Sequence, residues 1–133
     1  LLDGMGTTNG IEISPDERTL YVNETVQRRV WAFDLDERGE LSNRRLHHAF
    51  DEDLLDGMRC DAAGNLYVAR YGHGSVAKIS PRGELIGEIF LRGRDCTNIT
   101  FGGADGCTCY VTVADTGQIE TFRTDIPGRL TPP

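Results

Sequence analysis

Residues 55–69 read Leu-Asp-Gly-Met-Arg-Cys-Asp-Ala-Ala-Gly-Asn-Leu-Tyr-Val-Ala, which is a polar residue, a short strand, a turn and a second strand. A similar order recurs at residues 9–22 and, with a longer connection, at residues 98–111. The Tyr-Val pairs at the end of each segment begin at Tyr21, Tyr67 and Tyr110, which are 46 and 43 residues apart. A period of about 40–45 residues made of short strands is typical of propeller blades, each a four-stranded antiparallel sheet. The repeat therefore predicts an all-β, propeller-type fold.

Each period divides into predicted strands separated by turn residues. The expected blades span residues 9–50, 56–91 and 97–123, with strands at 10–14, 19–23, 29–34, 46–50, 58–61, 66–70, 76–80, 85–90, 98–101, 110–114 and 119–123. Two blades are complete and the third has three strands. Residues 125–133 contain three prolines and are not expected to form a central strand. A β-sandwich explains the number of strands but not the repeat.

Composition excludes two classes of partner. The 133 residues carry 21 acidic and 14 basic side chains, a net charge of -7, which is unsuited to general binding of the nucleic-acid backbone. No run approaches the roughly 20 apolar residues of a membrane span, and residues 1–5 lack the features of a signal peptide. The four cysteines form no CxxC pair, so they are either free thiols in a reducing cytoplasm or a disulfide that spacing cannot assign. We expect a cytoplasmic protein.

Three polar residues recur at the start of the repeats, namely Asn9, Asp56 and Asn98. The first strand of a blade is the innermost, so residues just ahead of it ring the mouth of the central channel. Oxygen donors in such a ring suit a hard divalent cation. The alternative is that Asn-Gly and Asp-Gly are simply turn dipeptides.

Several motifs together resemble the gluconolactonase/regucalcin (senescence marker protein type) family. The resemblance covers residues 5 to 123 and is carried by Asn9-Gly10-Ile11, Ser14-Pro15-Asp16, Ser42-Asn43-Arg44-Arg45, Leu55-Asp56-Gly57-Met58, residues 61–69 and Phe101-Gly102-Gly103. It implies a six-bladed propeller that hydrolyses sugar lactones. It also implies one divalent cation at the centre, calcium in the first place, with zinc, magnesium or manganese as alternatives.

The resemblance also implies roles for individual residues. Asn9 and Asp56 match two of the family's metal ligands, and Asp56 is the expected catalytic residue. The family's third ligand, a Glu in a Glu-Gly-Pro segment of an N-terminal blade, has no counterpart here. Thr97 and Asn98 occupy the matching place one blade on and are candidate substrate contacts.

Histidines give weaker predictions. His73 falls in a loop on the side of the channel mouth, where it would line the substrate entrance or shuttle a proton, or be an exposed loop residue without a role. His47 and His48 lie near the outer strand of the first blade and are expected to be solvated.

The chain is too short for six blades. Three blades of this size make half a ring, and the chain begins at Leu1 rather than Met. We expect the C-terminal half of a propeller, from a truncated or incomplete sequence or from a half-ring that assembles. The expected partners are a sugar lactone and either the missing N-terminal half or a second copy joined through open blade edges. The alternative to a lactonase is a non-catalytic propeller fragment that acts as a binding or assembly module.

Overall fold

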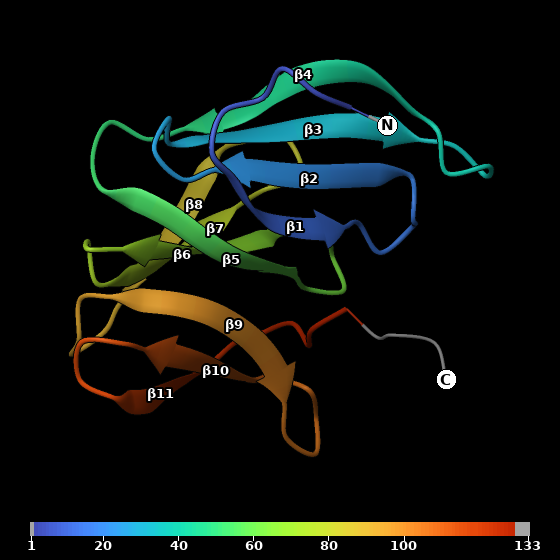
Figure 1. Ribbon diagram of the computed structural model, residues 1–133. Coiled ribbons are helices and arrows are strands. Elements are labelled where there is room, and N and C mark those ends of the chain that lie inside the picture. The colour runs from blue at the N-terminus through green and yellow to red at the C-terminus, as the bar shows by residue number, and fades with distance from the viewer. Residues whose placement is uncertain (1, 130–133) are drawn as a thin grey trace.

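The fold consists of three antiparallel β-sheets. The computed structural model in Figure 1 describes residues 2–129. Blade I contains β1 (Thr8–Ile13), β2 (Thr19–Glu24), β3 (Arg29–Leu35) and β4 (Leu41–Ala49); blade II contains β5 (Leu54–Cys60), β6 (Leu66–Tyr71), β7 (Ser75–Ile79) and β8 (Leu85–Phe90); blade III contains β9 (Cys96–Gly102), β10 (Thr108–Val113) and β11 (Gln118–Arg123). Within this described range, no helix is long and apolar enough to span a bilayer.

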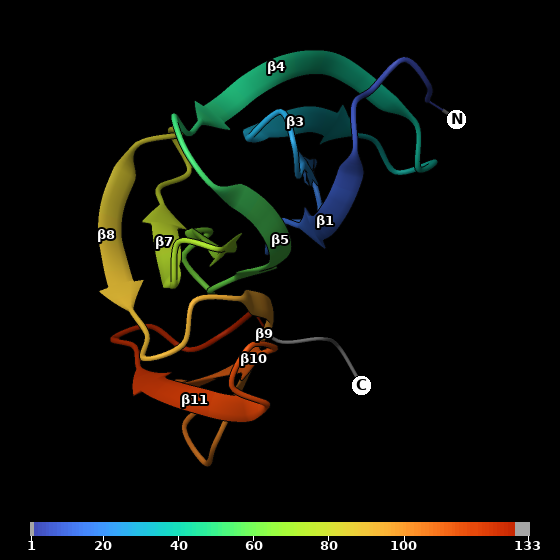
Figure 2. The same ribbon diagram turned by 60° about the vertical axis from the view of Figure 1, so that its left-hand side comes forward.

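Each blade is a simple meander, with strands paired in chain order. Figure 2 shows the three blades following one another along an arc, with β1, β5 and β9 on its inner side and β4, β8 and β11 on its outer side. The inner strands of neighbouring blades contact one another, β1 with β5 and β5 with β9. This arrangement confirms the predicted fold, a propeller of which three blades are present.

Two apolar layers between the blades form the core. The layer between blades I and II contains Tyr21, Val30, Ala32, Leu55, Met58, Cys60, Leu66, Val68 and Ile79. The layer between blades II and III contains Tyr67, Ala69, Val76, Cys96, Ile99, Cys109, Val111 and Val113. Alternation along each strand sends successive side chains to opposite faces, so the middle blade, blade II, contributes to both layers.

The inner strands begin earlier than predicted, at Thr8, Leu54 and Cys96. Asn9 and Asp56 therefore lie inside strands and not ahead of them, within register shifts between Thr8 and Ile11 and between Leu55 and Met58. A bulge of this kind adds a residue on one strand and re-aims its side chain.

The outer strand of blade I is longer than the predicted strand at 46–50. β4 already begins at Leu41, because the polar residues that follow Leu41 pair with β3 and form an exposed edge of the sheet. At the C-terminal end, the described residues after β11 form only an isolated bridge, between Gly128 and Asp61. This agrees with the absence of a central strand there, and residues 130–133 lie outside the described range.

Candidate functional site

The predicted ligands meet in one cavity on the inner side of the arc. Its volume is about 380 Å³, and it is lined by Asn9, Gly10, Ile11, Asp56, Gly57, Met58, Arg59, Thr97 and Asn98. Asn9 comes from β1, Asp56 from β5 and Thr97 with Asn98 from β9. Four of the five residues predicted for the site are thus brought together, and His73 is not.

Two glycines allow the inner strands to come this close. A Cβ on Gly10 would lie 2.6 Å from Nδ2 of Asn23, and one on Gly57 would lie 2.9 Å from Cα of Asn98. Both distances are shorter than real Cβ contacts allow. The glycine after the first two polar residues is therefore required by strand packing, and the interpretation of these dipeptides as simple turns is wrong.

A buried asparagine fastens β1 to β5 beside the cavity. Oδ1 of Asn23 accepts a hydrogen bond of 2.9 Å from the Gly10 backbone N–H, and its Nδ2 donates one of 2.6 Å to the Asp56 carbonyl oxygen. Asn23 is fully buried on β2. The sequence analysis did not single out Asn23. Its position directly after Leu20, Tyr21 and Val22 in a predicted strand could have indicated a buried amide with a specific hydrogen-bonding role.

Among residues 2–129, Asp56 is the only carboxylate that lines the cavity. Burial raises its pKa above the usual 3.8, opposed by hydrogen bonds from the Asn9 side chain and the Gly57 backbone. Asn9 and Asp56 line the same cavity from the inner strands β1 and β5. A partly desolvated carboxylate beside amide oxygens is a donor set that fits a hard divalent cation, so the residues present fit the metal that the resemblance implies.

The two predicted substrate contacts are held by neighbours in blade III. The Thr97 hydroxyl lies 2.7 Å from the Thr112 hydroxyl. Oδ1 of Asn98 accepts a hydrogen bond of 2.9 Å from the Ile99 backbone N–H, which leaves its Nδ2 as a donor at the exposed edge of the cavity.

Arg59 was not predicted and supplies the cavity's positive charge. Its NH1 donates a 2.7 Å hydrogen bond to the Met58 carbonyl oxygen, and it forms no ion pair within residues 2–129. The alternation of Met58, Arg59 and Cys60, with both neighbours buried, would have indicated that Arg59 points to the opposite face.

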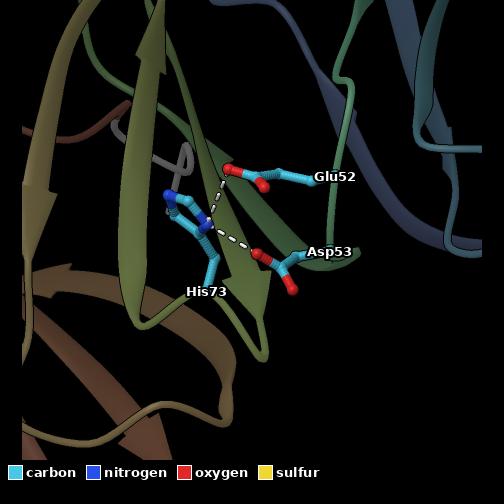
Figure 3. A group of neighbouring side chains, drawn as sticks. All are labelled: Glu52, Asp53 and His73. Carbon is cyan, nitrogen blue, oxygen red and sulfur yellow. Dashed lines mark hydrogen bonds and ion pairs between the residues drawn. The ribbon is translucent and has the colours of Figure 1, made fainter.

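His73 lies in a different cluster, at the turn between β6 and β7. Figure 3 shows its ring turned toward Glu52 and Asp53, which precede β5. Nδ1 of His73 lies 2.6 Å from an Asp53 oxygen and 3.8 Å from a Glu52 oxygen. The three side chains have the composition of a small metal site.

Further contacts give this cluster a structural explanation. Nε2 of His73 lies 3.3 Å from the Glu88 carboxylate, which also accepts hydrogen bonds from Ser75 and from the buried Arg70 guanidinium. Both ring nitrogens of His73 thus face carboxylates. The exposed loop histidine that the sequence allowed is wrong, because the ring is largely buried.

His47 and His48 are not solvated as predicted. His47 packs against the Tyr21 ring, with centroids 4.8 Å apart, and burial lowers its pKa. Nδ1 of His48 lies 2.9 Å from the Gly83 carbonyl oxygen. β4 curves over blade II at this point, so its last side chains are covered by the following blade.

The four cysteines are free thiols. Burial raises the pKa of Cys96 to about 11 and that of Cys60 and Cys109 to about 12. These three are therefore protonated at neutral pH and poor nucleophiles.

The chain is similar to several known proteins. The chain is 38% identical over 125 residues to regucalcin of Xenopus laevis, covering 91% of this chain and 42% of that protein. It is 31% identical over 141 residues to a 6-deoxy-6-sulfogluconolactonase of Pseudomonas putida, covering 94% and 48%. A calcium-binding regucalcin of Agrobacterium tumefaciens superposes with a TM-score of 0.76 at 27% identity, covering 92% and 46%.

The chain spans less than half the length of each of these three proteins. The sequence model of the SMP-30/gluconolactonase/LRE-like region matches residues 1–115. Because this match includes most of its residues, the chain belongs to the SMP-30/gluconolactonase/LRE-like family.

Proposed function

We propose that this chain supplies half of the active site of a sugar lactonase that depends on a divalent cation. The observation that carries the proposal is the cavity that Asn9 and Asp56 line together from the inner strands of neighbouring blades. The family and the lactonase from Pseudomonas putida support the reaction class. Because the chain spans less than half of such proteins, the whole ring would complete the site.

Asn9 and Asp56 would hold the cation, and calcium is the first candidate because the Agrobacterium relative is calcium-binding. When bound, a cation of this kind acts as a Lewis acid on the lactone carbonyl oxygen. Oxygen ligands of the same kind also bind magnesium and manganese, and a carboxylate is an accepted zinc ligand.

Asp56 is the proposed general base. Its carboxylate takes a proton from the water whose oxygen attacks the lactone carbonyl carbon. The carbon–oxygen bond of the ring then breaks, and the proton passes to the departing ring oxygen, which gives the open hydroxy acid. Thr97 and Asn98 would orient the sugar by hydrogen bonds to its hydroxyl groups. A role for His73 in proton transfer is not proposed, because its ring nitrogens face the Glu52–Asp53–Glu88 carboxylates.

The test is hydrolysis of glucono-δ-lactone, followed by acid release at constant pH. Within a completed ring, the chain should accelerate ring opening with calcium, magnesium or manganese, and chelation should abolish the effect. Asp56→Ala should reduce the rate at least a hundredfold, whereas Glu84→Gln, an exposed carboxylate outside the cavity, should leave it unchanged. Undiminished hydrolysis by Asp56→Ala would show that Asp56 is not the base.

A role as an assembly module is the second proposal, favoured by the exposed faces at both ends of the arc.

The thiols found free in this structure would suit a reducing compartment, so we propose the cytoplasm as the location of this protein.

A further inference from the structure

A histidine and two carboxylates converge where blade I is joined to blade II. Glu52 and Asp53 lie in the connection between β4 and β5, and His73 lies in the turn between β6 and β7. One ligand atom from each of the three side chains lies within 4.8 Å of the other two. Figure 3 shows the His73 ring turned toward both carboxylates. The cluster is therefore formed entirely by blade II and the connection that leads into it.

The distances within this cluster suit a small tetrahedral ion. Nδ1 of His73 lies 2.6 Å from an Asp53 oxygen and 3.8 Å from a Glu52 oxygen. Bonds of about 2.0–2.2 Å to nitrogen and oxygen place the ligand atoms of a tetrahedral zinc ion roughly 3.3–3.6 Å apart. The two measured distances lie on either side of this range, so small side-chain rotations would bring the three atoms around one ion.

The other ring nitrogen of His73 has the kind of partner that metal-binding histidines use. Nε2 lies 3.3 Å from the Glu88 carboxylate, which accepts hydrogen bonds of 2.6 Å from Ser75 and 3.1 Å from Arg70. A histidine that binds a metal typically donates its second ring N–H to a carboxylate, which fixes the orientation of the ring. Because a neutral imidazole carries one N–H, a ring that donates to Glu88 presents a lone pair at Nδ1. The contact with Glu88 thus explains Nε2 and leaves Nδ1 available to an ion.

The charges around the ring favour a divalent cation. Glu52, Asp53 and Glu88 supply three carboxylates to this cluster. The Arg70 guanidinium offsets one of them, because it lies 3.1 Å from Glu88 and donates a 2.8 Å hydrogen bond to the Glu52 carbonyl oxygen. A divalent ion would neutralise the other two. The His73 side chain is 19% exposed, so this attraction acts in a partly shielded place, where it is stronger than in water.

We propose that Glu52, Asp53 and His73 form a zinc site. Imidazole nitrogen and carboxylate oxygen are both zinc ligands, whereas calcium takes oxygen ligands. The ion would tie the connection before β5 to the turn between β6 and β7. Because it would bind the folded chain and not the unfolded one, it would stabilise blade II. The three residues lie outside the cavity of Asn9 and Asp56, so the zinc site does not depend on the proposed lactonase activity.

The test is isothermal titration calorimetry of the metal-free 133-residue chain with zinc chloride at neutral pH. We expect one zinc ion bound per chain and a midpoint of thermal unfolding that rises with zinc concentration. His73→Gln should abolish zinc binding. Glu52→Gln should weaken it by at least about tenfold, the loss typical of a missing outer-shell partner. Because the Glu52 side chain is 71% exposed, this variant should keep the circular dichroism spectrum of the native chain.

Glu84→Gln, which removes an exposed carboxylate outside the cluster, is the matched control and should bind zinc as the native chain does. Asp56→Asn should also leave zinc binding unchanged, so a failure of the lactonase proposal can be told apart from a failure of the zinc site. In ¹⁵N spectra of the histidine rings, zinc should shift Nδ1 of His73 more than Nε2. An absence of zinc binding, or zinc binding that Glu52→Gln and His73→Gln leave unchanged, would overturn the proposal.

Discussion

At the scale of single residues, the site depends on side chains that hold two inner strands together. Asn23 forms hydrogen bonds to the backbone of both β1 and β5, and Asn9 and Asp56 line the cavity beside it. Buried polar groups of this kind are costly when one partner is lost, because the other is left without a hydrogen bond. The hydrogen bonds that stabilise the boundary between β1 and β5 therefore also fix the positions of the candidate metal ligands.

Replacing Asn23 by alanine should therefore destabilise the fold. It leaves the Gly10 N–H and the Asp56 carbonyl oxygen unpaired, at a cost of about 2–3 kcal/mol. Urea unfolding followed by circular dichroism would measure the loss. Ser42→Ala, at an exposed strand position, should change the free energy of unfolding by less than about 0.5 kcal/mol. Equal stability of the two variants would contradict the role of Asn23.

The carboxylate Glu88 should give the fold a specific dependence on pH. Burial acts to raise its pKa, but hydrogen bonds from Ser75 and Arg70 outweigh it and hold the pKa below the usual 4.5. The stabilisation is thus fully present above about pH 4.5 and is lost as the pH falls through the lower pKa of the folded state.

Glu88→Gln should accordingly cost about 1–2 kcal/mol at pH 7, because it leaves the buried Arg70 without its ion pair. The difference from the native chain should shrink as the pH falls below 4.5, the usual carboxyl pKa. Urea midpoints at several pH values would record it, with the exposed Glu84→Gln as control. A difference that stays constant down to low pH would exclude ionisation of Glu88 as its cause.

At the scale of strands, the sequence predicted which strands exist better than where they begin. The Tyr-Val repeat and the Asn-Gly and Asp-Gly starts located all three blades. They could not reveal that Asn9 and Asp56 lie on bulges, because a bulge is defined by the pairing of two strands. The beginning of β4 was missed for a related reason, since its exposed residues lack the apolar alternation that marks a half-buried strand.

For the candidate site, too, the sequence indicated some of the residues but not their neighbours in space. The repeat pointed to the region of Asn9, Asp56, Thr97 and Asn98, but the predicted equivalence of Asn98 with Asn9 and Asp56 is wrong. Ile11, Met58 and Ile99 hold matching places in the strand pairing, so the residue equivalent to Asn9 and Asp56 is Thr97.

The repeat could not locate the partners of His73, since Glu88 comes from the far strand of the same blade and Asp53 from the connection before it. Asp53 also adopts a left-handed backbone conformation with φ of 59°, which no residue pattern indicated.

Close approach of the inner strands leads to a prediction for Gly57. An alanine there would bring its Cβ to 2.9 Å from the Asn98 backbone, so β9 must shift at a cost of about 1–3 kcal/mol. Gly87→Ala is the matched control, because its Cβ would make an ordinary contact of 3.8 Å with Lys78. Thermal unfolding would compare the two. A Gly57→Ala variant as stable as Gly87→Ala would show that the strands are not limited by this contact.

At the scale of the whole molecule, the arc is an open structure whose two end faces are unlike its interior. The apolar layers between the blades are completely buried, whereas Ile11, Tyr110 and Ile119 carry the same pattern into solvent. The candidate ligands Asn9 and Asp56 lie on β1 and β5, on the inner side of the arc.

Calcium titration of the ¹⁵N-labelled chain tests whether Asn9 and Asp56 form a cation site. We expect the amide signals of Asn9, Asp56 and Asn98 to shift with added calcium, and Asp56→Asn to abolish these shifts. His73→Ala, which removes the centre of the other carboxylate cluster, should leave them unchanged. If no signal shifts at Asn9 and Asp56, or if the shifts are confined to Glu52, Asp53 and His73, then Asn9 and Asp56 do not form a cation site.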